Sequence, residues 1–367
     1  MTKTHKFLAI TTVKIIYGLR NFLDGLSRMI LPAQIAVFET SMNFWISKAL
    51  GTAAELGIPD ILKDGPTHID ELAKKTHTDA SALYRLMRAL AGNGIFKEKN
   101  DKTFQNTKLG RALVEGNDPM KYMILHQTNK VNWNLAVELT SAVKQGDSIA
   151  ESVLGSDIFT YLEKQPESNH FYNKAMTKGS EFLSKTLTNF YDFPTFQTIV
   201  DIGGGEGIFL AHLLKKHPHA QGVLIDFDHV ISHAPSVLSR LGVADRVSLR
   251  SANCLEHIPA RADLYLMKNL LHAYNDENCI QILTNIGHVI QTKGKIVIVE
   301  MDIDEKNKFS LGKLFDLEML VGVAGGKERT VEQYDVLLKK SGFHIHQVVK
   351  TITPFHLIIG EKNEPLQ

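Results

Sequence analysis

The sequence predicts an α/β protein: a helical N-terminal part followed by a doubly wound domain with a mostly parallel sheet. Three observations lead to this fold class. Residues 1 to about 185 show mainly helical patterns, whereas strand and helix patterns alternate from Thr198 onward, which is typical of a parallel sheet. A glycine-rich turn at residues 203–207 follows the first buried strand. The last two strand patterns have no helix between them, so we expect an antiparallel final strand.

The composition limits the classes of protein to consider. The chain has 367 residues, enough for two domains, and 44% hydrophobic residues, enough to bury sizeable cores. Its net charge of +1 gives no support for a nucleic-acid partner. The two cysteines, Cys254 and Cys279, are too few for a disulfide framework or a zinc site. They indicate a reducing, intracellular setting, and we expect a cytoplasmic protein.

Two apolar stretches lie near the N-terminus, at residues 7–17 and 23–31. Charged residues such as Lys14 and Arg20 interrupt them, so we expect no signal peptide and no stable membrane span. The stretch could form an amphipathic helix that packs on a partner subunit or lies on a membrane surface. The slight positive charge favours the partner subunit.

The rest of the N-terminal part predicts a winged-helix unit, because a β-hairpin follows three helices. Such units often bind DNA, but the balanced charge favours a structural or dimerising role. Two longer helices come next, and a segment with Pro194 is the predicted junction between domains 1–190 and 191–367. The predicted elements are helices at 44–56, 68–75, 83–91, 133–144 and 171–187 and hairpin strands at 95–98 and 103–106.

Candidate site residues follow the strands of the doubly wound domain, because ligands of such sheets bind beyond the carboxyl ends of the strands. The predicted strands are 199–202, 222–226, 247–250, 263–267, 295–300, 343–349 and 355–361. The residues that follow them, with a later loop at 325–330, are Gly203, Gly205, Gly207, Asp226, Asn253, Cys254, Lys268, His272, Glu300 and Glu328.

The glycine-rich turn indicates an adenosine-containing cofactor. Glycines allow positive φ and close approach of the backbone to a ligand. Asp226 lies 21 positions after Gly205, close to the spacing of an acid that binds ribose hydroxyls. A dinucleotide fingerprint requires glycine where Ile208 stands, and no Gly-Lys-Ser/Thr ending marks a P-loop. A turn without a ligand remains the alternative.

His272 lies in a loop between a strand and a helix, which favours a role as general base over a structural role. Glu300 and Glu328 could orient its imidazole and favour the protonated form. They could instead form ion pairs, for example with Lys295 or Arg329. The three residues could also suggest a metal site, but no helical His-x-x-x-His spacing supports one, and we predict none.

Five motifs resemble the O-methyltransferase family of the plant caffeic-acid and flavonoid type, which includes acetylserotonin and bacterial polyketide and carotenoid O-methyltransferases. The resemblance covers about residues 35 to 361. It implies a helical dimerisation domain with a winged-helix core and a Rossmann-like methyltransferase domain, in a homodimer whose subunits complete each other's substrate pockets. The motifs are V-D-I-G-G-G-E-G, L-I-D-F-D-H-V-I, L-M-K-N-L-L-H-A-Y-N-D-E, I-V-I-V-E and G-G-K-E-R-T.

The resemblance also implies a role for each candidate. His272 matches the catalytic base, and Glu300 and Glu328 match its flanking acids. In the order of the chain, the S-adenosyl-L-methionine contacts are Ser180, Gly203, Gly205, Asp226, Asn253, Cys254 and Lys268. Tyr172 and Met176 share one face of the helix at 171–187 with Ser180 and match substrate contacts, although core packing would give the same spacing.

The sequence departs from the family pattern at three places. Asn253 replaces an adenine-binding acid, Ala273 replaces the acid beside the base, and Gly179 stands where plant relatives often have a histidine. We therefore expect an S-adenosylmethionine-dependent O-methyltransferase that acts on a hydroxyl of a small, aromatic molecule other than the plant phenylpropanoids. The alternatives are hydroxylation or decarboxylation with the bound cofactor, and a non-enzymatic winged-helix regulator.

Overall fold

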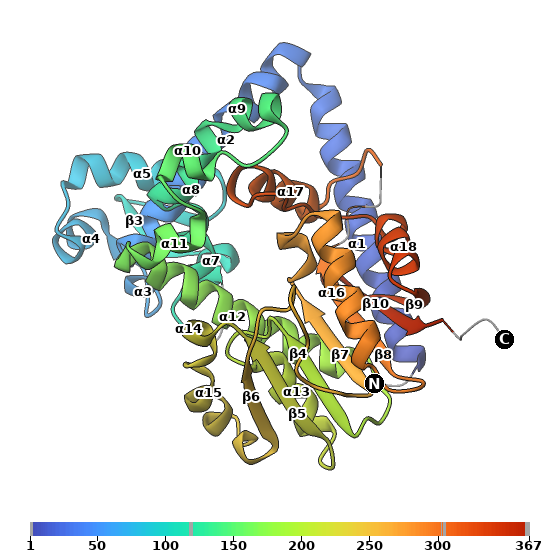
Figure 1. The fold of residues 1–367 in the computed structure, drawn as a ribbon. Coiled ribbons are helices and arrows are strands. Elements are labelled where there is room, and N and C mark those ends of the chain that lie inside the picture. Colours follow the sequence, from blue (N-terminus) through green and yellow to red (C-terminus); the bar gives the residue numbers. More distant parts are fainter. Residues whose placement is uncertain (1–2, 117–119, 302, 304–305, 364–367) are drawn as a thin grey trace. The chain divides into compact units, whose positions relative to one another are not determined.

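The computed structural model describes residues 3–116, 120–301, 303 and 306–363 (Figure 1). These residues form two compact units. The first contains the chain up to Asn21, the segment Leu135–Tyr161 and the chain from Leu183 onward, and the second contains Phe22–Asn134 and Leu162–Phe182. The division into domains 1–190 and 191–367 stays a prediction.

A seven-stranded sheet forms the centre of the first unit, and its strand order is β6-β5-β4-β7-β8-β10-β9 (Figure 1). The first five strands in this order are parallel, whereas β10 pairs antiparallel with both β8 and β9. The predicted doubly wound sheet with an antiparallel final strand is therefore confirmed. The strands are β4 (Thr198–Ile202), β5 (Gln221–Asp226), β6 (Val247–Ser251), β7 (Leu264–Lys268), β8 (Lys295–Met301), β9 (Phe343–Lys350) and β10 (Phe355–Lys362).

Helices cover both faces of this sheet, because the central strands are apolar on both sides. On one face, Leu187 and Leu210 belong to a buried cluster with Leu224 and other strand residues. On the other face, Leu283 packs in a second cluster that includes Ile225. The α-helices that follow α12 in this unit are α13 (Ile208–Lys216), α14 (Asp228–Ile231), α15 (Ala234–Arg240), α16 (Asp276–Val289), α17 (Leu311–Gly322) and α18 (Val331–Lys340). Of these, α17 packs in a separate cluster, in which Val321 contacts the segment 135–150.

The second unit contains the predicted hairpin and the helices before it. The hairpin strands pair with the short strand β1 in the order β1-β3-β2. Asp79 begins the third helix by accepting a hydrogen bond from the backbone N–H of Ala82 at 2.8 Å. The elements are α2 (Ala33–Glu55), α3 (Ile58–Ile61), β1 (Thr67–His68), α4 (Ile69–Thr76), α5 (Ala80–Gly92), β2 (Phe96–Lys99), β3 (Thr103–Asn106), α6 (Lys108–Arg111) and α7 (Met120–Gln127).

Some helix boundaries differ from the prediction. The helix expected at 44–56 begins at Ala33, directly after Pro32, because no helix-breaking residue lies between. The helix expected at 133–144 is two helices, since the backbone leaves helical geometry at Glu138, where φ is −90° and ψ is 14°. The helices between the hairpin and β4 that lie partly or wholly outside the second unit are α8 (Lys130–Val137), α9 (Leu139–Gln145), α10 (Ala150–Leu154), α11 (Ile158–Glu163) and α12 (Pro166–Phe190).

The N-terminal stretch forms one helix, α1 (Lys3–Ile30), which fits the predicted amphipathic helix. Among the residues that the structure describes, no helix has the length and apolarity to cross a bilayer.

Candidate active site

The glycine-rich turn joins β4 to α13 at the carboxyl edge of the sheet. Gly203, Gly205 and Gly207 have φ of 65°, 59° and 77°, a left-handed region that disfavours residues with a Cβ. The N–H of Gly203 donates to the carbonyl of Ile225 on the neighbouring strand at 2.8 Å. A Cβ at Gly204 would lie 2.6 Å from the carboxylate of Asp201. The sequence therefore needs these glycines to fold the turn tightly over the end of β4.

Asp226 ends β5 and faces this turn. Its Oδ2 accepts a hydrogen bond from the N–H of Gly205, and its Oδ1 accepts one from the N–H of Phe227, both at 2.8 Å. Burial raises the pKa of Asp226, although these two bonds act to lower it. The carboxylate is thus fixed next to the turn, where its remaining lone pairs can accept hydrogen bonds from hydroxyl groups.

A small pocket opens between the turn and the neighbouring strand ends. Its walls are mostly apolar, and Asp226 supplies a carboxylate at one side. The ring of Phe227 is 46% exposed and stacks on His229 with centroids 6.0 Å apart and planes 9° apart. This lining fits a nucleoside, since apolar and aromatic walls suit a base and a carboxylate suits ribose hydroxyls. The lining residues are Ile202, Gly203, Ile225, Asp226, Phe227, Ala252, Cys254, Leu270 and Tyr274.

The two residues predicted after β6 occupy different surroundings. Cys254 is buried in the pocket wall, and burial raises the pKa of its thiol. The side chain of Asn253 is used locally: Oδ1 accepts from the N–H of Leu255 at 3.1 Å, and Nδ2 donates to Glu256 at 3.2 Å. Asn253 is absent from the pocket lining given above, so its predicted adenine contact stays a prediction.

Lys268 ends β7, close to two buried carboxylates. Burial lowers the pKa of Lys268, and the charges of Asp201 and Glu300 act against this effect. Burial also raises the pKa of Asp201 to about 7, although the charge of Lys268 acts to lower it. Neither carboxylate oxygen of Asp201 has a hydrogen-bond partner among the described residues.

The imidazole of His272 lies between two buried glutamates, in the short helix η2 (Leu271–Ala273) after β7. Its Nδ1 lies 2.8 Å from Oε1 of Glu328 and 3.8 Å from Oε2 of Glu300. Each glutamate side chain is 1% exposed, whereas His272 is 18% exposed. A proton on Nδ1 shared with Glu328 leaves the lone pair on Nε2, the arrangement that a general base requires.

The charges of the two glutamates raise the pKa of His272. Burial alone acts to lower this pKa, but the charge of Glu300, and the hydrogen bond and charge of Glu328, act more strongly in the opposite direction. Burial raises the pKa of Glu300 to about 7, the charge of Glu328 raises it further, and the charge of His272 acts to lower it. The site therefore favours the imidazolium form that results when His272 accepts a proton.

Backbone amides hold Glu300 in place. Its Oε1 accepts hydrogen bonds from the N–H groups of Leu270, Leu271 and His272 at 3.1, 3.0 and 3.4 Å. The N–H of Glu328 in turn donates to Asp316 of α17 at 2.8 Å. Main-chain groups thus hold the carboxylate of Glu300, and the side chain of Asp316 holds the backbone of Glu328.

The ion pairs considered as alternatives do not form among the described residues. Lys295 pairs with Glu361 at 2.7 Å. Arg329 pairs with Asp276 at 2.8 Å, and its side chain is fully buried. Asp316 is a supporting residue that the sequence did not indicate, and the sequence suggested Arg329 only as a possible partner of the glutamates.

His272, Glu300 and Glu328 place their ligand atoms within 4.8 Å of one another, which could also hold a metal ion. The absence of a metal therefore stays a prediction.

Tyr172, Met176 and Ser180 lie on α12, in the second unit. The ring of Tyr172 packs edge-on against His126, with centroids 5.3 Å apart. Met176 is 36% exposed. His272 belongs to the first unit, so the roles of these three residues in a shared pocket stay predictions.

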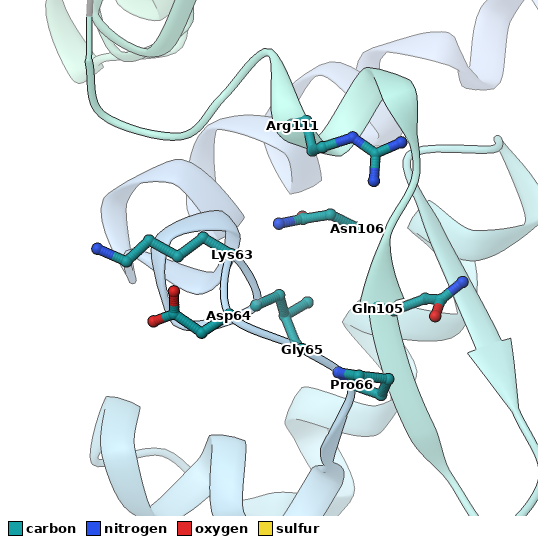
Figure 2. A pocket seen from close by; sticks show the side chains of 8 residues that line it. Lys63, Asp64, Gly65, Pro66, Gln105, Asn106 and Arg111 are labelled. Carbon is teal, nitrogen blue, oxygen red and sulfur yellow. The ribbon is translucent and has the colours of Figure 1, made fainter.

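A further pocket lies within the second unit, beside the hairpin (Figure 2). It contains none of the predicted site residues. Its lining residues are Leu62, Lys63, Asp64, Gly65, Pro66, Gln105, Asn106 and Arg111.

Two family models match the chain. The model of an O-methyltransferase domain matches residues 136–344, and the model of an O-methyltransferase dimerisation domain matches residues 38–116.

Similar proteins agree with these matches. The phenazine O-methyltransferase PhzM of Lysobacter antibioticus is 32% identical over 330 residues, which is 89% of this chain and 96% of that protein. The phenazine-1-carboxylate N-methyltransferase of Pseudomonas aeruginosa is 26% identical over 320 residues, which is 87% of this chain and 94% of that protein. The crystal structure of CalO1, a methyltransferase in calicheamicin biosynthesis in its SAH-bound form, has a TM-score of 0.80 at 31% identity and covers 89% of this chain and 97% of its own.

Proposed function

This chain belongs to the O-methyltransferase family, and from this premise we propose that it methylates a hydroxyl group of a small aromatic acceptor with His272 as the general base. As a member of this family it is a methyltransferase that uses S-adenosyl-L-methionine. The single observation that carries the proposal is the 2.8 Å bond between Nδ1 of His272 and Oε1 of Glu328. It orients an imidazole in a cofactor-binding domain so that Nε2 can accept a proton.

The cofactor supplies an electrophilic methyl group on a sulfonium. The chain offers a fitting cradle for it, since the pocket beside the glycine turn combines apolar walls with the carboxylate of Asp226. In the proposal Gly203 and Gly205 approach the methionine part and Asp226 accepts bonds from the ribose. Cys254 and Phe227 flank the adenine, with Asn253, Lys268 and Ser180 as further cofactor contacts.

His272 removes the hydroxyl proton as the acceptor oxygen attacks the methyl group in line. Alignment of the two reactants supplies most of the acceleration, and the base contributes about 10²–10⁴-fold. The negative charges of Glu300 and Glu328 stabilise the imidazolium that forms, which agrees with the raised pKa of His272. After transfer, Nε2 returns its proton to solvent.

The aromatic nature of the acceptor is supported by the names of the relatives, two of which act on phenazines. Tyr172 and Met176 are the proposed acceptor contacts. The match to a dimerisation domain supports a homodimer. The two cysteines are unpaired and buried, which supports the reducing, cytoplasmic setting.

Methyl transfer is favoured over hydroxylation or decarboxylation because the imidazole of His272 is hydrogen-bonded to Glu328 and lies 3.8 Å from the carboxylate of Glu300, as a general base requires. A winged-helix regulator without enzymatic activity is disfavoured by the same group and by the net charge of +1.

The test combines cofactor binding with a screen of acceptors. Calorimetry should show S-adenosylmethionine binding to the wild type and to His272→Ala alike. A screen of phenols, catechols and hydroxyphenazines should then give S-adenosylhomocysteine and a methyl ether with the wild type, and a loss of about 10²–10⁴-fold in kcat with the variant. Unchanged turnover in the variant would remove His272 from the mechanism.

A further inference from the structure

The N-terminal helix α1 exposes a row of large apolar side chains that the proposed reaction does not use. Six of them, with Thr12 in the same row, follow one another at alternating spacings of four and three residues. Each of the six is between 44% and 82% exposed. We call this row the α1 seam; its residues are Leu8, Thr12, Ile15, Leu19, Phe22, Leu26 and Met29.

The spacing of the α1 seam is typical of a helix that packs against another helix. Alternating steps of four and three average 3.5 residues, the repeat of a left-handed coiled coil. Beside the seam, Ile16, Leu23 and Ile30 are also exposed and widen the apolar surface.

The part of α1 up to Asn21 belongs to the first unit and packs within it through other sides of the helix. The guanidinium of Arg20 lies 4.5 Å above the ring of Phe309. Ile10 and Val13 are partly buried. The helix is thus attached to its own chain through residues outside the seam.

Glycines next to the seam favour a protein partner over a lipid surface. Gly18 and Gly25 are seven residues apart, and a Cβ built at either position would meet no described atom within 4 Å apart from the backbone of the helix itself. Glycine in a helix costs about 1 kcal/mol relative to alanine, and a helix lying in a membrane interface gains nothing in return. Between two packed helices, small residues let the backbones approach closely.

The match to a dimerisation domain supports a second copy of the chain as the partner. Helix α2, the next helix in the chain, exposes Ile35, Phe38, Met42 and Trp45 with the same alternating spacing. The last three of these lie within residues 38–116, which match the dimerisation domain. The α1 seam therefore continues, in sequence, an apolar pattern that already belongs to a pairing segment.

The lack of charged residues in the α1 seam also favours packing against a second copy of the chain. In a two-fold interface a surface meets its own copy, so like charges within it would face each other. The α1 seam contains no charged residue, and Lys14, Arg20 and Asp24 all lie outside it.

We propose that the α1 seam packs helix against helix on a second copy of this chain and so extends the dimer interface beyond residues 38–116. This inference rests on the homodimer proposed above. It assigns a role to the first thirty residues, which precede the segment matched by the dimerisation model.

The test compares two charge variants of the full-length chain by sedimentation velocity over a dilution series. Leu19→Glu with Phe22→Glu places two carboxylates in the seam, whereas Tyr17→Glu with Ser27→Glu adds the same charge elsewhere on α1. The seam variant should raise the dimer Kd at least about 100-fold, as expected when central apolar contacts of an interface are lost. The control should stay within about threefold of the wild type. A seam variant with the wild-type Kd would overturn the proposal.

Further measurements distinguish packing of the α1 seam on a second copy from failure of the homodimer proposal and from membrane binding. Circular dichroism and S-adenosylmethionine binding should be unchanged in the seam variant, and deletion of residues 1–31 should weaken the dimer to a similar extent. A monomeric wild type would contradict the homodimer itself. Binding of the wild type to phosphatidylserine vesicles, lost in a seam variant that remains dimeric, would show that the seam meets a membrane instead.

Discussion

Arg329 donates two hydrogen bonds to one carboxylate oxygen of Asp276, from Nε at 3.0 Å and from Nη2 at 2.8 Å. The same guanidinium donates to the carbonyl oxygens of Leu271 and Tyr274 at 2.9 and 2.7 Å. Arg329, which directly follows Glu328, is thus hydrogen-bonded to Leu271 and Tyr274, which lie before and after His272 in the chain. One fully buried cation fixes the relative position of the base and its acid.

Replacing Arg329 by methionine should therefore destabilise the protein. The change removes the charged donor from the carbonyl groups of Leu271 and Tyr274, and a hydrogen bond to a charged group contributes about 1.5–3 kcal/mol. Since Asp276 is 47% exposed and water can solvate it, we expect a total loss of about 3 kcal/mol in the free energy of unfolding. Urea titration of the variant measures this loss.

The control is Lys327→Met, because Lys327 also contacts Asp276, at 3.0 Å, but is 42% exposed. The free energy of unfolding of Lys327→Met should fall by less than about 1 kcal/mol. Equal losses in both variants would contradict the role of the buried guanidinium.

The pH dependence of the reaction should report the pair His272–Glu328. Glu328 raises the pKa of His272 through its hydrogen bond and its charge, and only the neutral imidazole can accept a proton. In Glu328→Gln the pKa of His272 falls, so the acidic limb of kcat/KM should move to lower pH, while the plateau of kcat drops about tenfold or more. Stopped assays from pH 5 to 9 measure both.

Glu332→Gln serves as the control, since Glu332 is an exposed acid in the first turn of α18. Its profile should overlay that of the wild type. An unshifted acidic limb in Glu328→Gln would show that the limb belongs to another group.

The buried carboxyl group of Asp201 should make stability fall with rising pH. Its pKa is raised to about 7 in the folded chain, mainly by burial, and lies near 3.9 when unfolded. The protonated form is thus favoured by folding, and this contribution is complete below about pH 4 and is lost as the pH rises to about 7. Asp201→Asn should be about 4 kcal/mol more stable relative to the wild type at pH 8 than at pH 4.

Thermal or urea unfolding of both proteins at these two pH values gives the difference directly. The attraction of Lys268 for the ionised carboxylate already lowers this pKa and is therefore contained in the expected difference. A relative stability independent of pH would contradict the burial of a titrating carboxyl group.

Gly205→Ala should weaken cofactor binding as well as stability. The position has φ of 59°, and a Cβ there meets no described atom within 4 Å, so strain of about 1–2 kcal/mol comes from the backbone alone. The N–H of Gly205 also donates to Asp226. Any relaxation of the turn therefore moves the proposed ribose acceptor, and we expect the Kd of S-adenosylmethionine to rise about tenfold.

Gly242→Ala is a matched control, because Gly242 has φ of 70° and equally open surroundings. It should show a similar loss of stability with unchanged cofactor affinity. Equal affinities in the two variants would remove Gly205 from the cofactor site.

The sequence predicted those features of the site that depend on one residue type in a short stretch of chain. Glycine at positive φ in the turn, Asp226 at the end of β5 and His272 in a loop at the strand ends were all predictable, because each depends on a short stretch of chain. The mostly parallel sheet with its antiparallel final strand followed from the alternation of strands and helices, whereas the strand order was not predicted.

Contacts between distant segments were not predictable in the same way. Phe227 in the pocket wall, Asp316 beneath Glu328 and Arg329 across the loop depend on the folded backbone. Asn253 is instructive too: its place after a strand suggested a ligand contact, which stays a prediction, and its side chain also accepts a hydrogen bond within a local turn.

The three amide bonds to Glu300 have a consequence for how such a site can change over time. The position of the imidazole is set by main-chain groups of residues 270–272, and main-chain groups are present whatever the neighbouring side chains are. Alanine can therefore stand at position 273 without releasing the base. Substitutions at position 273 can then adapt the site to a new acceptor while the position of the His272 imidazole stays the same.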